Sequence, residues 1–463
     1  MKIYNTMSRT KEEFVPLTPG VVRMYVCGVT VYDLSHIGHA RSAMAFDVIR
    51  RYFEFKGYRV TFVRNYTDVD DKIIRRANEL GVPAREVSER FIAAEREDMA
   101  SLGLRAADVE PRATEHIPEM IALIERLVAR EVAYVLDGDV YFEIRRFPRY
   151  GRLSGKNLDE LLAGARVDVD ERKRDPRDFA LWKAAKPGEP AWPSPWGAGR
   201  PGWHIECSAM AMRYLGESFD VHGGGEDLVF PHHECEIAQA EAATGRMFAR
   251  YWLHNGFVNL GKEKMSKSLG NTLTIRELVR RHDPDAIRLF FLGTHYRHSL
   301  EWSEERLQES ARALERFTRL LDDPRAGGAP GGPPPARFAA FRPQFEAAMD
   351  DDFNTPQALG VLFDLARALH EERDRAGGGA AGVAALAAGV AELRALGGVL
   401  GLFARRRAAV GPPPEVERLV AERRAARERR DFRRSDELRA EIAALGWAVE
   451  DTPAGPRLTR KDP

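Results

Sequence analysis

Cysteine is scarce in this chain, and its scarcity excludes one class of protein. Only Cys27, Cys207 and Cys235 occur in 463 residues. A small, odd number of cysteines in a chain of this length argues against the disulfide frameworks of small secreted proteins. Taken one at a time, free cysteines are most often small buried hydrophobic residues, so each needs a second signal before it is assigned to chemistry.

The chain also lacks an excess of either charge and lacks long apolar runs. Lys+Arg and Asp+Glu both total 70, so the formal net charge is zero and any nucleic-acid surface must be a local patch. No apolar run in the sequence is long enough to span a membrane, and residues 1–5 carry no apolar signal core. We therefore expect a cytoplasmic protein with no membrane partner, of a length that favours several domains.

The first 70 residues have the pattern of a βαβ unit. Val21–Cys27 is β-branched and apolar and is followed by a glycine, Arg41–Tyr58 has helical periodicity, and Tyr58–Asn65 again resembles a strand. Such a unit predicts a parallel sheet, in which ligands bind at the carboxyl ends of the strands. Cys27 and the segment Tyr66–Asp70 are expected at such ends.

The rest of the chain indicates further domains. A Gly-, Pro- and Trp-rich stretch, 151–202, suggests an insertion of loops and short strands, with a hairpin before it that turns at residues 137–139. Gly/Pro-rich stretches at 323–335, 376–382 and 411–414 separate Ala- and Leu-rich helices from a last unit that starts with an Arg-rich helix and ends in a small hairpin. We predict an α/β fold with a Rossmann-like parallel-sheet core in residues 1–116 and 200–255, a connective insertion in 117–199, a connecting region in 256–310, an α-helical bundle in 311–410 and a small α+β unit in 411–463.

Two short strings have the composition of phosphate sites. His36-Ile37-Gly38-His39 lies before a predicted helix, whose free N–H groups and dipole favour phosphate, and Gly38 allows close approach of a base or ribose. Lys264 and Lys267, in a Lys-Met-Ser-Lys-Ser string, suit a loop that neutralises a pyrophosphate leaving group. Each string alone is equally compatible with turn histidines or a solvated surface loop.

A third group of residues has the chemistry of a zinc site. Cys27, Cys207 and His232 are joined by two further donors, Cys235 and Glu236, and a helix starting at Pro231 would place His232 and Glu236 on one face. Spacing does not choose between Cys235 and Glu236 as the fourth ligand. Nearby, a triple glycine at 223–225 precedes Asp227, whose carboxylate could accept hydrogen bonds from an ammonium group.

Together and in this order, these strings resemble the cysteinyl-tRNA synthetase family of class I aminoacyl-tRNA synthetases. The resemblance extends to Tyr66–Ile73, to 202–210 and to 222–239, and covers the chain from end to end. It implies activation of L-cysteine with ATP and Mg²⁺, followed by transfer to the terminal adenosine of tRNA(Cys). It implies that His36, Gly38, His39, Lys264 and Lys267 bind ATP and act in catalysis, that Thr67, Trp203, His222 and Asp227 line the cysteine pocket, and that Cys27, Cys207, His232 and Glu236 hold one zinc ion.

The same resemblance gives a logic of specificity. A zinc ion that binds the substrate thiolate rejects serine, so no editing domain is needed. The C-terminal unit matches the anticodon-binding end of the family, and in its arginine run, 423–434, we single out Arg427 and Arg430, with Asp436, as tRNA contacts. A monomer is expected from the resemblance.

Two rival functions share part of this pattern. A ligase that joins cysteine to glucosaminyl-inositol in mycothiol synthesis has the same adenylation chemistry and zinc pocket. The basic terminal unit and the string Glu234–Gln239 count against it. A non-catalytic paralogue that binds tRNA or nucleotide would be expected to lose a signature, and here all of them are intact.

Overall fold

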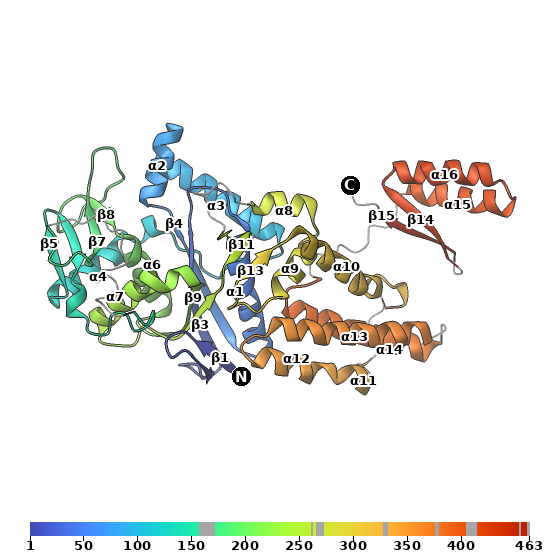
Figure 1. Cartoon of the computed structure of the whole chain (residues 1–463), viewed down its shortest axis with the longest axis horizontal. Coiled ribbons are helices and arrows are strands. Elements are labelled where there is room, and N and C mark those ends of the chain that lie inside the picture. Colours follow the sequence, from blue (N-terminus) through green and yellow to red (C-terminus); the bar gives the residue numbers. More distant parts are fainter. Residues whose placement is uncertain are drawn as a thin grey trace. The chain divides into compact units, whose positions relative to one another are not determined.

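The computed structural model describes residues 1–156, 172–260, 263–264, 273–326, 332–375, 379–403, 414–452 and 455–460. The chain divides into two units, 1–404 and 405–463, and each is described by itself (Figure 1). The first unit opens with a two-stranded antiparallel hairpin, β1 (Lys2–Asn5) and β2 (Thr10–Glu13).

The centre of the first unit is a four-stranded parallel sheet in the order β10-β9-β3-β4. Its strands are β3 (Val21–Thr30), β4 (Arg59–Thr67), β9 (Phe219–Gly225) and β10 (Ala249–Asn255), and α1 (Ile37–Phe55) connects β3 to β4. The predicted βαβ unit and α/β fold class are confirmed. The predicted helix start was wrong, because α1 begins four residues before Arg41, immediately after the capping residue His36. Cys27 was expected at a strand end but lies inside β3, which continues past a register irregularity to Thr30.

Alternation along β3 sends its side chains into two cores. Val22, Met24 and Val26 pack with α1, whereas Tyr25 packs with α6 (Trp203–Leu215) and α7 (Glu234–Thr244) on the opposite face. Both faces of the sheet are therefore covered by helices, as buried parallel sheets require. The helices cover the two faces of the sheet but not the carboxyl ends of its strands, so a site can form at that edge.

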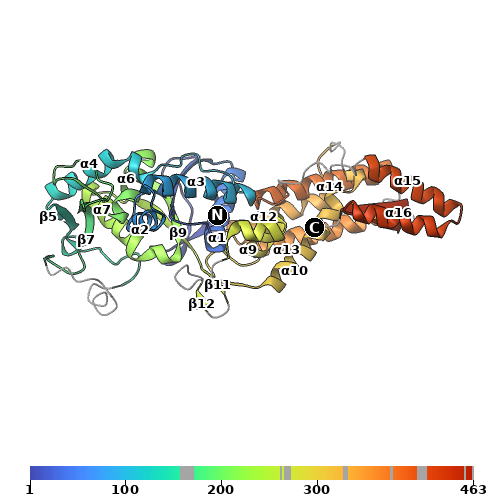
Figure 2. The same ribbon diagram turned by 90° about the horizontal axis from the view of Figure 1, so that it is seen from above.

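Two regions inserted after β4 border this edge. A helical hairpin, α2 (Asp71–Leu80) and α3 (Ala84–Ser101), comes first and is followed by α4 (Ile117–Ala129). An antiparallel sheet of β5 (Ala133–Leu136), β6 (Asp139–Phe142), β7 (Phe179–Ala184) and β8 (Gly199–Pro201) follows, and Asp137 and Gly138 form the predicted hairpin turn with φ of 51° and 86°. Within the first unit, this small sheet and the helical bundle lie at opposite ends, with the parallel sheet between them (Figure 2).

The connecting region and the bundle complete the first unit. A three-stranded sheet of β11 (Val258–Leu260), β12 (Glu263–Lys264) and β13 (Leu300–Trp302) accompanies α8 (Ile275–Arg281) and α9 (Pro284–Leu292). The bundle consists of α10 (Glu304–Leu321), α11 (Ala336–Ala339), α12 (Phe341–Asp350), α13 (Thr355–Arg375) and α14 (Ala380–Val399). The break predicted at 376–382 is too long, because α14 already begins at Ala380 and contains Gly382.

Helix α14 is the one described helix that is long and apolar enough to cross a membrane. Leu386, Val390, Leu393 and Leu396 bury one side of it in the core that the bundle shares with α1. Its apolar composition is therefore explained by packing inside the protein, because a helix that is apolar on most sides is normal in a core.

The second unit is small and has its own core. It contains α15 (Pro414–Glu428), α16 (Phe432–Ala444) and a hairpin of β14 (Trp447–Thr452) and β15 (Gly455–Arg460). The sequence predicted one Arg-rich helix and the hairpin; the hairpin is present, but the arginine run spans two helices and a turn. Arg423 is only 2% exposed, so it is not part of a solvent-facing basic surface.

Candidate active site and metal centre

A cavity of about 840 Å³ opens at the carboxyl ends of the parallel strands. It brings together six of the side chains and glycines predicted from the sequence: Cys27, His36, Gly38, His39, Trp203 and Asp227. Two other predicted residues, Thr67 and His222, are buried and do not line it. Thr67 donates a hydrogen bond to Glu206 Oε2 (3.0 Å), and His222 Nε2 lies 2.8 Å from Glu236 Oε2.

The two histidines of the first string cap α1. His36 Nδ1 accepts a hydrogen bond from Gly38 N (3.1 Å), and His39 Nδ1 accepts one from His36 N (3.3 Å). The rings are stacked, with centroids 3.8 Å apart. Because each Nδ1 is an acceptor, the proton of each neutral ring resides on Nε2. Both rings can therefore offer an N–H donor beside the positive end of the helix dipole.

At Gly38 and Gly225 of this wall, the absence of a side chain leaves room for a neighbouring side chain. A Cβ at Gly38 would lie 2.9 Å from the His36 ring, so the capping histidine itself excludes a side chain there. A Cβ at Gly225 would lie 2.6 Å from Asp227 Oδ1. The glycines thus make room for His36 and for the carboxylate of Asp227, and the sequence argument had assigned Gly38 to ligand approach alone.

A buried cluster of donors lies at one end of the cavity. Cys27, Cys207, His232 and Glu236 offer four ligand atoms within 4.8 Å of one another. Cys27 Sγ is 3.5 Å from His232 Nε2 and 3.2 Å from Glu236 Oε1, and His232 Nε2 is 3.0 Å from the same oxygen. Two thiols, an imidazole and a carboxylate are a donor set that suits zinc.

Local structure differs from the prediction where His232 enters this cluster. Helix α7 begins at Glu234, whereas the sequence predicted a start at Pro231. Residues Val229–His233 form a π-turn in which Phe230 has non-helical backbone angles. The turn and helix together still bring His232 next to Glu236, as the four-residue spacing predicted.

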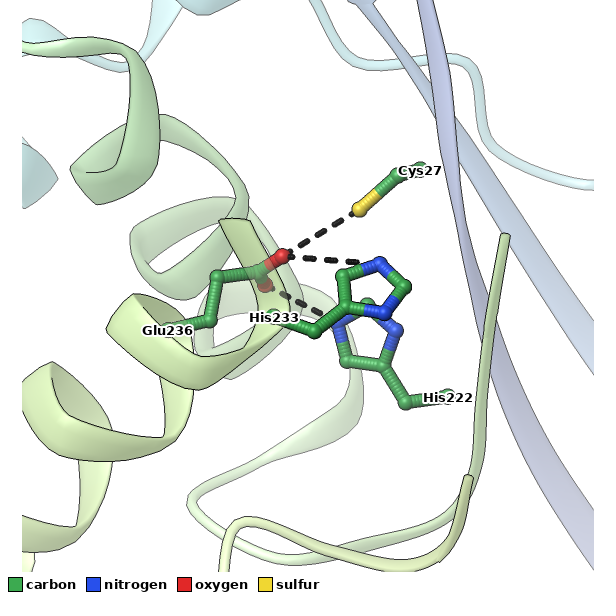
Figure 3. A group of neighbouring side chains, drawn as sticks. All are labelled: Cys27, His222, His233 and Glu236. Atoms are coloured by element: carbon green, nitrogen blue, oxygen red, sulfur yellow. Dashed lines mark hydrogen bonds and ion pairs between the residues drawn. The ribbon is translucent and has the colours of Figure 1, made fainter. Parts of the chain in front are cut away.

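A second group shares two members with the first. Cys27 and Glu236 also converge with His222 and His233 (Figure 3). His222 contacts the other oxygen of Glu236, and His233 Nε2 is 3.9 Å from Oε1 and has no hydrogen-bond partner among the described residues. His222 therefore contacts the Glu236 oxygen that faces away from Cys27 and His232, and so orients that carboxylate. The first group contains two thiols, Cys27 and Cys207, whereas the second contains Cys27 alone.

The electrostatics of the cluster favour the ionised forms of Glu236 and Cys207 despite their burial. Burial opposes the charge of Glu236, but His222 and His232 outweigh it and hold the pKa of the carboxyl at about 2. Burial likewise opposes the Cys207 thiolate, but the hydrogen bond with Cys27 and the charge of His232 lower the pKa of that thiol to about 6. Burial and the neighbouring Cys207 raise the pKa of the Cys27 thiol. The cluster thus carries negative charge that a bound cation would compensate.

Cys235 belongs to neither group. Its Sγ lies 3.2 Å from the Tyr150 hydroxyl, and burial raises the pKa of its thiol well above its ordinary value. The choice between Cys235 and Glu236, which spacing left open, therefore falls on Glu236 by geometry.

Several supporting residues carried no assigned role in the sequence argument. His204 Nδ1 lies 3.0 Å from His232 Nδ1, and His254 Nε2 lies 2.8 Å from His233 Nδ1. Burial lowers the pKa of His204 and of His254 to about 3, so both rings are neutral at physiological pH. Glu206 is buried beneath Thr67 and burial raises its pKa. Their position beside the strings 202–210 and 222–239 was the available signal.

The remaining predicted residues are placed only in part. The backbone of Lys264 lies in β12, paired with Asn259, and Lys267 is outside the described residues. In the second unit, Arg427 lies in the last turn of α15, Arg430 lies in the following turn with φ 58°, and Asp436 lies in α16; all three are exposed.

Comparison with protein families identifies three consecutive matches. Residues 13–312 match the class I (C) tRNA synthetase catalytic domain, residues 344–404 the DALR domain, and residues 409–455 the cysteinyl-tRNA ligase anticodon-binding domain. The chain is 54% identical over 477 residues to cysteine–tRNA ligase of Geobacter metallireducens, covering 98% of both chains, and 55% identical over 471 residues to that of Alkalilimnicola ehrlichii, covering 100% of both.

Solved structures show the same fold at low sequence identity. Methionyl-tRNA synthetase of Mycobacterium tuberculosis in complex with methionyl-adenylate matches with a TM-score of 0.58 at 16% identity, over 82% of this chain and 90% of that one. A leucyl-tRNA synthetase ternary complex of Agrobacterium radiobacter matches with a TM-score of 0.59 at 13% identity, over 84% and 85%.

Proposed function

The chain belongs to the cysteine–tRNA ligase family of class I aminoacyl-tRNA synthetases and activates L-cysteine with ATP to charge tRNA, and from this premise we propose how its residues divide the work. The observation that carries the proposal is the cavity itself. It joins the buried Cys/His/Glu cluster at one end to the two capping histidines of α1. The mycothiol-type ligase is not favoured, because the match extends through an anticodon-binding domain.

We assign a zinc ion to Cys27, Cys207, His232 and Glu236. The fit is supported by the donor chemistry, by complete burial and by the depressed pKa values of Cys207 and Glu236. When bound, zinc supplies an acceptor that prefers sulfur to a hydroxyl oxygen, which is the basis for discriminating cysteine from serine. His222 and His204 then orient Glu236 and His232 from behind, as outer partners of metal ligands commonly do.

The substrate amino acid is held at the mouth of this cluster. Trp203 lies 4.4 Å from His232, ring centroid to ring centroid, is 39% exposed, and forms one side of the cavity. We assign the substrate ammonium to Asp227, which lines the same cavity. Thr67 and His222 support this pocket through Glu206 and Glu236.

Adenylation takes place at the capping histidines. The cysteine carboxylate attacks the α-phosphorus of ATP and pyrophosphate leaves. His36 and His39 donate hydrogen bonds from Nε2 to phosphoryl oxygens, where negative charge develops in the transition state. Lys264 and Lys267 hold the departing pyrophosphate together with the Mg²⁺ that accompanies ATP. In the second step the 2′-hydroxyl of the terminal adenosine of tRNA attacks the adenylate carbonyl, and AMP leaves.

Further assignments complete the proposal. The second unit binds the anticodon of tRNA(Cys), with Arg427, Arg430 and Asp436 as contacts. We assign residues 1–116 and 200–255 to the two halves of the catalytic core and 117–199 to the connective insertion. Residues 256–310 form the connecting region, 311–410 the helical bundle and 411–463 the anticodon-binding unit. The protein works as a monomer in the cytoplasm and needs no membrane.

The deciding experiment separates these functions by acceptor. A tRNA with the GCA anticodon is offered with cysteine or serine, next to a glucosaminyl-inositol acceptor. We expect charging with cysteine only, and loss of bound zinc together with charging in Cys207→Ala. Pyrophosphate exchange without tRNA charging would move the function to the mycothiol-type ligase, and absence of exchange would leave only a binding protein.

A further inference from the structure

A second hollow lies beside the active cavity and belongs to none of the sites described above. It has a volume of about 360 Å³ and is open to solvent. Three arginines from three helices line it: Arg76 of α2, Arg90 of α3 and Arg276 of α8. Figure 1 shows α3 running between α2 and α8, and we call the hollow that these three helices line the arginine cleft.

The arginines are only partly neutralised by neighbours. Arg90 is exposed and has no ion-pair partner among the described residues; its guanidinium lies 5.5 Å from the centroid of the Phe91 ring. Arg76 Nη1 is 3.1 Å from Glu79 Oε2, but its Nε is buried and without a hydrogen-bond partner. Arg276 is fixed by Asp98 through Nε at 3.1 Å. The cleft therefore holds guanidinium N–H groups that can still donate hydrogen bonds to a ligand.

Two carboxylates also line the cleft and limit its charge. Glu97 is exposed, and Asp33 Oδ1 accepts a hydrogen bond from the backbone N–H of Leu34 (2.8 Å). Among the lining residues three cations face two anions, and Arg90 is the lining guanidinium that no carboxylate among the described residues pairs, since Glu79 and Asp98 engage Arg76 and Arg276. Guanidinium groups favour planar, bidentate contact with phosphate, whereas a purely cationic ligand would meet three like charges here. The ligand that suits the cleft is a polyanion with neutral parts.

Residues that line the cleft are neighbours in the chain of residues that line the active cavity. Tyr32 and Lys72 line that cavity, and Lys72 Nζ lies 5.5 Å from the centroid of the Tyr32 ring. Asp33 directly follows Tyr32, and Arg76 is one helical turn, about 5.4 Å along the axis, beyond Lys72 on the same face of α2. A chain molecule whose end is in the cavity would pass an aromatic ring and a lysine and then enter the arginine cleft.

We propose that the arginine cleft binds backbone phosphates of the single-stranded 3′ end of tRNA, while Tyr32 stacks with a base at the mouth of the cavity. This inference rests on the proposed function, which places the terminal adenosine in the cavity. An alternation of aromatic rings and cations is how proteins hold single-stranded nucleic acid without reading its sequence. Arg76 and Arg90 bind the phosphates. Arg276, which Asp98 holds in place, lines the cleft beside the bound phosphates.

The test uses the two half-reactions of the whole protein. In Arg76→Ala/Arg90→Ala, cysteine-dependent ATP–pyrophosphate exchange, which needs no tRNA, remains unchanged. The KM for tRNA in charging rises about tenfold, as expected for loss of charge-assisted phosphate contacts, and the dependence of log KM on log salt becomes shallower by about one unit per lost contact. The matched control is Arg75→Ala, an exposed arginine on the same helix that does not line the cleft, which leaves the KM unchanged.

A truncated tRNA identifies which part of the molecule is bound. A tRNA without its single-stranded 3′ end inhibits wild-type protein and the double variant with the same inhibition constant, because it cannot reach the cleft. An unchanged KM for intact tRNA in the double variant, an equal effect of Arg75→Ala, or parallel loss of exchange and charging would each overturn the proposal. Absence of exchange in the wild-type protein would instead refute the proposed function.

Discussion

The Cys235 thiol lies 3.2 Å from the Tyr150 hydroxyl, and Cys235, the cysteine nearest in sequence to Glu236, is outside the cluster to which we assign zinc. We therefore expect Cys235→Ala to keep one zinc per chain and full charging activity, at a cost of about 1 kcal/mol in stability for the lost buried sulfur. Cys207→Ser, an equally small change, should lose zinc, because a hydroxyl is a poor zinc ligand. Zinc content by atomic absorption checks both; metal loss in Cys235→Ala would contradict the assignment.

The contact between His222 and Glu236 predicts a graded effect on metal affinity. His222 is fully buried, its Nε2 lies 2.8 Å from Glu236 Oε2, and its ring is stacked on Trp252. Because an outer partner orients the ligand it contacts, His222→Ala should weaken zinc binding by about 10–100-fold. His222→Gln, which can still donate to the carboxylate, should recover part of this loss. Competition with a chelator measures both, and an unchanged affinity in His222→Ala would leave the residue with a role in the substrate pocket alone.

The local parts of the fold could be predicted from sequence because they depend on neighbours in the chain. Strand–helix–strand alternation around α1 and the turn at Asp137-Gly138 are of this kind. The metal cluster is not, since Cys27 and His232 are 205 residues apart and no periodicity relates them. Only the resemblance to a family supplied that set. The outer residues His204 and His254 lay in or near quoted strings, but a role for them requires distances.

For the arginine run, 423–434, the sequence predicted a larger basic surface than the structure has. A local excess of positive charge predicted a basic surface, but charge counts do not report burial. Arg423 points into the core of the second unit, and Arg424 and Arg434 are engaged by Glu428 and Glu437. Arg424 and Arg433 remain exposed although each faces a glutamate, and Arg427, Arg429 and Arg430 are exposed at the end of α15 and in the following turn.

Arg41 of α1 contacts the end of α9 and the loop that follows it, and this loop contacts the wall of the cavity. It is buried without a carboxylate partner among the described residues and donates to backbone carbonyls of Phe291, Thr294 (3.1 Å) and His295 (2.9 Å). This loop in turn accepts the backbone N–H of Gly256, which lines the cavity, at Tyr296 O (2.9 Å).

Replacing Arg41 by lysine should therefore let the loop shift. We expect the KM for ATP in pyrophosphate exchange to rise about tenfold, with zinc content and the KM for cysteine nearly unchanged, because small displacements of a positioning wall are costly. Arg51→Lys, on the same helix but paired with Asp47, is the matched control. An equal rise in both KM values would indicate general loosening of the core and contradict the specific role.

His295 is expected to account for part of the loss of folding stability at acidic pH. Burial lowers the pKa of its imidazole to about 4, and its Nδ1 accepts the Arg297 N–H (3.4 Å), leaving no place for a second proton. Because the unfolded chain, with an ordinary pKa near 6.5, binds that proton first, its contribution to stability is complete above pH 6.5 and is lost as pH falls toward 4. The loss is about 3 kcal/mol over this range. Urea unfolding of wild type and His295→Gln at pH 7.5 and 5 should show the smaller pH dependence in the variant.

The two nitrogens of His36 have separable roles, which substitution can test. Nδ1 caps α1 by accepting the Gly38 N–H, and Nε2 is the other ring nitrogen of a side chain that lines the cavity. Asparagine places an oxygen where Nδ1 was and has no counterpart of Nε2, so His36→Asn should keep the cap and the melting temperature. Its kcat for adenylation should fall about 10²–10³-fold, as for loss of one transition-state donor.

Glutamine gives the converse variant, because its terminal amide reaches the position of Nε2 and leaves the cap unmade. His36→Gln should lose about 1 kcal/mol of stability through the cap while keeping more of kcat than His36→Asn. Thermal unfolding and pyrophosphate exchange on the same preparations separate the two effects. If both variants lost activity in proportion to stability, the histidine would be a helix cap only, and the charge developing on the phosphate would have to be met by His39 and the lysine loop.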